Sequence, residues 1–129
     1  MRAAALLPLI LALAACGRSA PEPPAATSVA APVALTCADG FETLVARIKA
    51  APGLAAAPPE PGEPYRFYNA QDGRASYLVT EPGAPGHPAI LLQQAVGGGQ
   101  VRNSGCPFGD RQGYDQLTAY LESLARRPK

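Results

Sequence analysis

The 129-residue sequence lacks the residue combinations on which most small catalytic and metal sites depend. It contains one histidine and three cysteines, and these four residues are not spaced as the ligands of a metal site. It also has no Gly-x-Ser-x-Gly elbow and no close carboxylate pair in a recognisable context. We therefore expect no catalytic residue, no metal and no cofactor.

The sequence likewise has no excess of charge of either sign. Eleven Lys and Arg residues oppose ten Asp and Glu residues, which gives a formal net charge of +1. A domain that binds nucleic acid usually carries a clear basic patch or stripe. We therefore expect no nucleic-acid partner.

The sustained apolar run of the chain lies at its N-terminus, in Ala3–Leu13. It is too short to cross a bilayer as a helix, which takes about 20 residues. Arg2 precedes this run and the small residues Ala14 and Ala15 follow it, which is the three-part pattern of an export signal. Residues 1–15 are therefore predicted to be a signal peptide.

The end of this signal, Leu13-Ala14-Ala15-Cys16, resembles the lipobox of bacterial lipoproteins. The resemblance covers only about the first 16 residues, and it implies that Cys16 is the lipid-carrying first residue of the mature protein. In such lipoproteins an Asp at the next position typically signals retention at the inner membrane, so Gly17 favours the periplasmic face of the outer membrane. The alternative is ordinary secretory cleavage, because Ala12-Leu13-Ala14 also fits the A-x-A pattern.

If Cys16 carries lipid, Cys37 and Cys106 remain, an even number in an oxidising compartment. A disulfide between them would close a loop of about 70 residues and contribute ~4 kcal/mol in the chain-entropy model. The alternative is a small envelope enzyme in which His87 activates Cys106 as a nucleophile. We favour the disulfide, because His87 lies between a glycine and a proline and is typical of a loop residue.

Two segments follow the signal. Residues 16–36 contain mainly Ala, Pro, Ser and Thr and cannot bury enough apolar surface to fold, so they are predicted to be a tether. Residues 37–129 are predicted to form one small domain of the α+β class.

The first helix of this domain is predicted to start at Asp39, because Asp39 and Glu42 have the spacing of a capping box. Pro52-Gly53 ends it. Its apolar stripe consists of Phe41, Leu44, Val45 and Ile48. The proline-rich segment Leu54–Pro64 is predicted to be a long connection.

Tyr65–Thr80 is predicted to be a hairpin that turns at Gln71-Asp72-Gly73. A two-residue Asp-Gly turn would pair Phe67 with Leu78, and a bulged turn would pair Phe67 with Tyr77. We favour the bulged register because it places most of the large side chains on one face.

A third strand is expected at Ala89–Val96 and a short edge strand at Gln100–Asn103, on either side of a glycine turn. A final helix follows, capped by Asp110. Its apolar stripe consists of Tyr114, Leu117, Leu121 and Leu124.

The expected architecture is therefore helix, three- or four-stranded antiparallel sheet, helix, with both helices on one sheet face. The opposite face is predicted to be a partner surface that includes Arg66, Tyr68, Leu78 and Leu91. The alternative is that Leu54–Pro64 folds across this face and covers it.

These features favour a non-catalytic cell-envelope lipoprotein, an accessory or binding module that faces the periplasm. Its expected partners are the membrane, through the lipid on Cys16, and an envelope protein of unknown identity.

Overall fold

The computed structural model describes Gly17 and residues 31–126. The lipobox and Cys16 lie outside these residues. The elements are η1 (Cys37–Asp39), α1 (Phe41–Ala50), β1 (Leu54–Ala56), β2 (Tyr65–Ala70), β3 (Ala75–Thr80), β4 (Ala89–Val96), β5 (Gln100–Pro107) and α2 (Arg111–Ala125). The predicted α+β class is confirmed.

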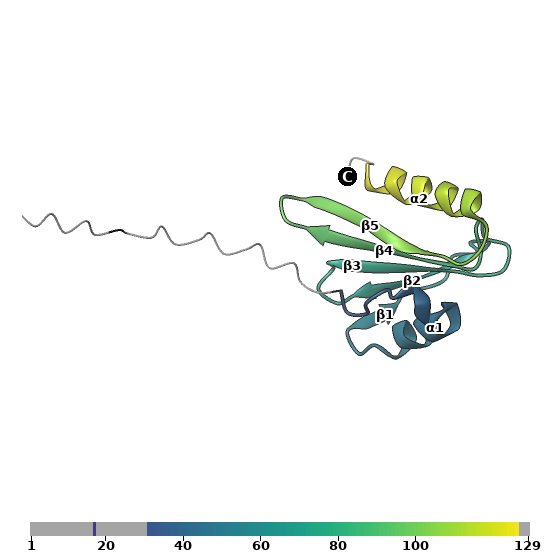
Figure 1. Ribbon diagram of the computed structural model, residues 1–129, viewed down its shortest axis with the longest axis horizontal. Coiled ribbons are helices and arrows are strands. Elements are labelled where there is room, and N and C mark those ends of the chain that lie inside the picture. Colours follow the sequence, from purple (N-terminus) through teal and green to yellow (C-terminus); the bar gives the residue numbers. More distant parts are fainter. Residues whose placement is uncertain (1–16, 18–30, 127–129) are drawn as a thin grey trace, which may run out of the picture.

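The strands form one antiparallel five-stranded sheet in chain order, β1-β2-β3-β4-β5 (Figure 1). The predicted count of three or four was too low, because the start of the expected proline-rich connection pairs with β2 as a short strand. In this pairing Leu54 lies opposite Ala70. The last strand also runs beyond the expected Asn103, to Pro107.

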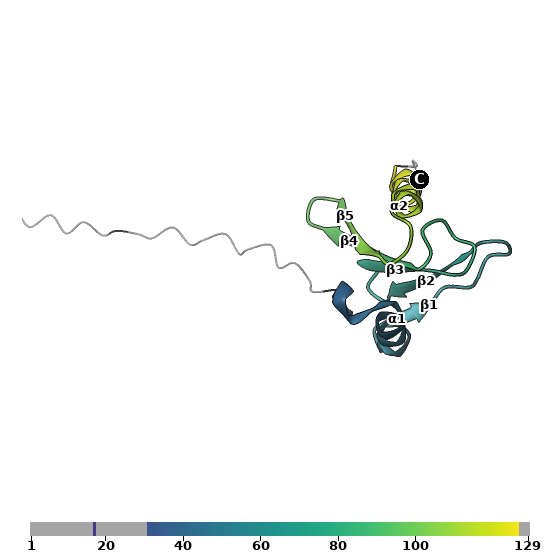
Figure 2. The ribbon, with the colours of Figure 1, turned by 45° about the vertical axis from the view of Figure 1, so that its right-hand side comes forward.

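The two helices lie on opposite faces of the sheet, with α2 above it and α1 below it in Figure 2. The core under α1 includes Leu44, Ile48, Tyr77, Ile90 and Leu92. The core under α2 contains Leu78, Leu91, Leu117 and Leu121. The prediction that both helices share one face was therefore wrong. Because each face has a helix to cover it, β3 and β4 can carry large apolar side chains on both sides.

The β2–β3 hairpin has the register that the sequence analysis did not favour. Phe67 lies opposite Leu78, and Tyr68 lies opposite Tyr77. This register divides the large side chains between the two faces. The bulged register was preferred on the assumption of a single covered face, and that assumption fails here.

The stripe of α1 is buried as expected, but the expected cap is not used. Gly40 occupies the N-cap position of α1, where no side chain caps the helix. Asp39 ends η1 instead, and its carboxylate forms an ion pair with Arg47. The capping-box prediction was therefore wrong, although α1 ends at Ala50, just before Pro52-Gly53.

The packed part of the chain begins before Cys37, inside the segment predicted to be a tether. Val33 is only 7% exposed and belongs to the core under α1. Its N–H donates to the hydroxyl of Tyr77 at 2.9 Å, and that hydroxyl donates to the Val33 carbonyl at 2.6 Å. Burial raises the pKa of Tyr77, although the backbone hydrogen bond from Val33 opposes this effect.

The start of α2 is held against the loop between β3 and β4. Asp110 caps the helix as predicted, because its carboxylate accepts from the Gly113 N–H at 2.7 Å. A Cβ atom placed on Gly113 would lie 2.2 Å from the backbone nitrogen of Gly86. Only glycine permits this backbone approach, which fixes the path of α2 across the sheet.

Candidate ligand groove

The predicted partner surface does not exist as an open face. Leu78 and Leu91 are each 1% exposed and lie beneath α2. Tyr68 packs on the other side of the sheet, against the core under α1. Arg66 is half-buried and forms an ion pair with Glu81. The prediction was wrong because α2 covers the face that was expected to stay open. The alternative, in which Leu54–Pro64 covers that face, is not observed for Leu78 and Leu91 either, because these two leucines are buried by α2.

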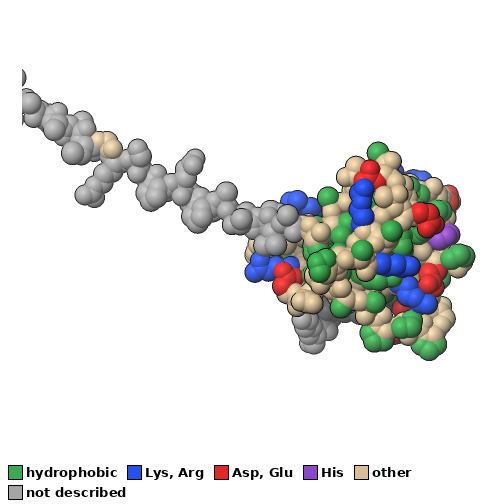
Figure 3. Space-filling view, turned by 90° about the horizontal axis from the view of Figure 1, so that it is seen from below, with side chains coloured by type: hydrophobic (Ala, Val, Ile, Leu, Met, Phe, Trp, Pro, Cys, Tyr) green, Lys and Arg blue, Asp and Glu red, His purple; other side chains and the backbone are tan. Residues whose placement is uncertain are grey.

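The α1 side of the molecule offers no surface of one charge sign. Figure 3 shows this side from below, with Lys and Arg side chains scattered among Asp, Glu and apolar side chains. On this side Arg47 of α1 is paired with Asp39 of η1.

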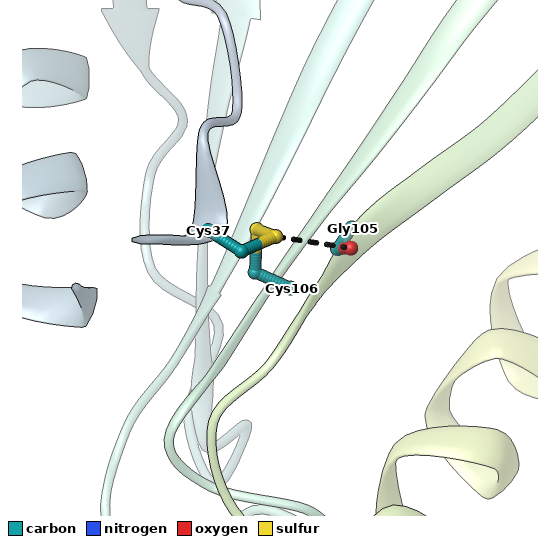
Figure 4. The surroundings of a disulfide bond; sticks show 3 residues. All are labelled: Cys37, Gly105 and Cys106. Atoms are coloured by element: carbon teal, nitrogen blue, oxygen red, sulfur yellow. Dashed lines mark hydrogen bonds between the residues drawn. A yellow bond between two sulfur atoms is a disulfide. The ribbon is translucent and has the colours of Figure 1, made fainter. Parts of the chain in front are cut away.

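Cys37 and Cys106 form the predicted disulfide, with their Cα atoms 5.4 Å apart (Figure 4). The Sγ atom of Cys37 lies 3.8 Å from the carbonyl oxygen of Gly105. A disulfide sulfur carries no hydrogen, so this contact is not a hydrogen bond. Cys106 is fully buried, and Cys37 is exposed. The disulfide therefore ties η1 to the last strand at the edge of the core.

His87 does not form a nucleophile–base pair with Cys106, because the sulfur of Cys106 is bonded to Cys37. The Nδ1 atom of His87 lies 2.9 Å from the hydroxyl of Thr80, and its ring packs edge-on against Phe41 at a centroid distance of 5.6 Å. Thr80 is buried and also accepts from the backbone N–H of Ala89. His87 therefore helps to hold the loop between β3 and β4.

A groove of about 540 Å³ lies between the segment that follows β1 and the C-terminal half of α2. One wall is the proline-rich segment 57–61 with Glu63, the floor is the start of β2, and the other wall is α2. The residues that line it are Ala57, Pro58, Pro59, Glu60, Pro61, Glu63, Tyr65, Arg66, Phe67, Tyr120 and Leu124.

The proline-rich wall is attached to the sheet at both ends. The N–H of Ala57 donates to the carbonyl of Phe67 at 2.9 Å, and the N–H of Glu81 donates to the carbonyl of Pro64 at 2.8 Å. Between these points the N–H of Glu63 donates to the Glu60 carbonyl at 3.2 Å. Proline fixes φ, so Pro58, Pro59 and Pro61 further limit the conformations of this wall. The groove is therefore largely pre-formed.

Aromatic side chains form the apolar part of the groove. The rings of Tyr65 and Phe67 pack edge-to-face at 6.4 Å, and the rings of Tyr65 and Tyr120 lie 6.1 Å apart. Leu124 extends this surface along α2. These rings are half-buried and present apolar area that a ligand can cover without a large loss of side-chain entropy.

The polar part of the groove is acidic. The guanidinium of Arg66 is 3.2 Å from the carboxylate of Glu81, so its charge is compensated. Glu60 and Glu63 have no ion pair within the described part of the chain. The pKa of Tyr65 is raised, mainly by burial, then by Tyr120 and by the negative charge of Glu63. The groove thus combines aromatic rings with two uncompensated carboxylates.

Sequence reasoning missed this groove, although it located the proline-rich segment and the aromatic strand that form two of its sides. The proline-rich segment was interpreted as a connection, and the favoured register placed most of the large side chains of the hairpin on one covered face. The relevant signal was the close succession of a rigid proline segment and an aromatic strand. Pairing of Leu54–Ala56 with β2 is what folds the proline segment back beside that strand.

Comparisons with known proteins do not assign the site. No protein-family model, no curated protein and no solved structure matches the chain. Within residues 31–126 no helix is long and apolar enough to cross a membrane. The same residues contain no group of three or more His, Cys, Asp and Glu side chains that could hold a metal ion.

Proposed function

We propose that this protein is a non-catalytic lipoprotein of the cell envelope, anchored through Cys16 at the periplasmic face of the outer membrane, and that it binds an envelope protein in the groove between residues 57–64 and α2. The lipobox resemblance supports the anchor. The groove supports the binding role and is the observation that carries it, because it is pre-formed and combines apolar rings with a few polar groups.

The groove also has the residue types that dominate binding energy at protein interfaces. Tyrosine and arginine are enriched among interface residues whose truncation costs most, and Tyr65, Arg66 and Tyr120 line the groove. Tyr120 lies on α2, where it contacts Tyr65 but belongs to the periphery of the apolar core. It can therefore be truncated with a smaller effect on folding than a core leucine.

A crosslinking pull-down from the native envelope tests this proposal. Tyr120→Ala should strongly reduce recovery of the partner, because such truncations at the centre of an interface cost about 2 kcal/mol or more in binding. Thr43→Ala is the matched control, since Thr43 is exposed on α1, on the opposite side of the sheet. Urea unfolding of both variants separates lost binding from lost stability. Equal recovery with Tyr120→Ala and with the wild type refutes the proposal.

A further inference from the structure

We infer that the groove binds an extended peptide segment that carries a lysine or arginine side chain. This inference names the class of ligand and rests on the proposed binding function. It is carried by two features of the groove, an open backbone edge at Tyr65 and the two carboxylates without an ion pair beside aromatic rings.

The backbone of Tyr65 is available to pair with an extended segment. The N–H of Glu81 donates to the Pro64 carbonyl, so this carbonyl points toward the β3 side. Along an antiparallel strand the N–H and C=O groups of successive residues point to alternate sides, so those of Tyr65 point away from β3. The bond from the Ala57 N–H to the Phe67 carbonyl shows the same outward direction two residues later.

No described residue satisfies these two groups of Tyr65. The strand β1 ends at Ala56, and the chain then leaves the edge of β2. Pro58 and Pro59, which follow, have no N–H to donate. A ligand in extended conformation could supply both a donor and an acceptor here, as in other cases of strand addition to a sheet edge.

The side chains of the groove select a cation. Glu60 and Glu63 attract a positive charge, and Tyr65 and Tyr120 line the same groove, where an ammonium or guanidinium group can approach an aromatic ring. Arg66 does not oppose this selection, because Glu81 compensates its charge. An acidic segment would instead place like charges next to each other, which disfavours its binding.

Fluorescence anisotropy with the full chain in detergent micelles tests this inference. The probes are a labelled, capped pentapeptide Gly-Lys-Val-Lys-Gly and its counterpart with Glu in place of Lys. The Lys peptide should bind and the Glu peptide should not. The double variant Glu60→Gln, Glu63→Gln should weaken binding of the Lys peptide about tenfold. The control Glu42→Gln removes an exposed carboxylate from α1 and should leave binding unchanged.

Backbone pairing is tested separately, by N-methylation of the central valine of the Lys peptide, which removes its N–H. The unmodified peptide should shift the amide resonance of Tyr65, and the methylated peptide should bind more weakly. Equal binding of the Lys and Glu peptides, or full binding by the double variant, overturns the inference. If Tyr120→Ala still loses the native partner in that case, the groove remains the binding site and only the cationic class is wrong.

Discussion

Removal of the disulfide should cost this small domain a large part of its stability. We predict that Cys37→Ser lowers the free energy of unfolding by about 4 kcal/mol. The bond joins residues separated by 69 positions, and a loop of that length corresponds to ~4 kcal/mol of chain entropy in the unfolded state. A domain of this size has a total stability of only about 5 to 14 kcal/mol.

Cys37 is the better position for this test, because it is exposed and a serine there stays in contact with water. Cys106 is fully buried, so a serine at that position would also place a hydroxyl group in the apolar core. The free energy of unfolding is measured by urea denaturation with and without a reductant. Reduction should destabilise the wild type by the same amount as Cys37→Ser, and it should have no effect on the variant.

Two results would refute this reasoning. A loss below about 1 kcal/mol for Cys37→Ser would show that the bond does not restrict the unfolded chain as the loop model requires. Two freely alkylated thiols in oxidised protein from the envelope would show that the bond is not formed, and would return Cys106 and His87 to consideration as a catalytic pair.

Three further predictions concern the helix contact, the buried tyrosine and the anchor. Gly113→Ala should destabilise the fold by ~1 to 3 kcal/mol in urea unfolding, because the new Cβ would meet the backbone of Gly86. This cost should exceed the gain from alanine's better helix propensity. The control Gln116→Ala, on the exposed side of the same helix, should be nearly neutral. Burial raises the pKa of Tyr77 above its ordinary value of about 10, so the stability that this group contributes is present below that pH and is lost as pH rises through the folded-state pKa. Tyr77→Phe should therefore reduce the alkaline fall in stability, which is followed by tyrosinate absorbance and unfolding. It should also cost ~1 to 3 kcal/mol at neutral pH, because the bonds to Val33 are lost. Intact mass of the membrane-extracted protein should show a lipidated Cys16, and a soluble protein that begins at Ala15 or Cys16 without acyl mass would exclude the anchor.

Much of the secondary structure could be predicted from local patterns. The apolar stripe of α1, the Asp110 cap of α2 and the bounds Ala89–Val96 of β4 are all confirmed. The pairing of Cys37 with Cys106 followed from the two cysteines that remain once Cys16 is assigned to the lipid anchor. These features depend on residues close in sequence or on simple arithmetic, so a single sequence suffices for them.

The placement of the helices could not be obtained from the stripe of either helix alone. Each stripe shows that a helix covers a sheet face, but not which face. The run Ile90-Leu91-Leu92 was the available signal, because three consecutive apolar residues in a strand indicate that both faces are buried. The same consideration favours the observed pairing of Phe67 with Leu78.

The groove was beyond sequence reasoning for a different reason. Its wall and floor are adjacent in sequence, but the third side is Tyr120 and Leu124 of α2, about 60 residues later. Their position depends on the path of α2, which the contact between Gly86 and Gly113 fixes. A groove of this kind can be found only after the long-range packing is known.

Site-specific photo-crosslinking in the native envelope tests the central claim most directly. A photo-reactive residue at Pro61, on the wall of the groove, should form an adduct with the partner, whereas the same group at the exposed Thr43 on α1 should not. The adduct from position 61 should also disappear when Tyr120→Ala is added. Equal adducts from both positions, or an adduct from position 61 that persists in the Tyr120→Ala variant, would contradict the assignment of the groove as the binding site.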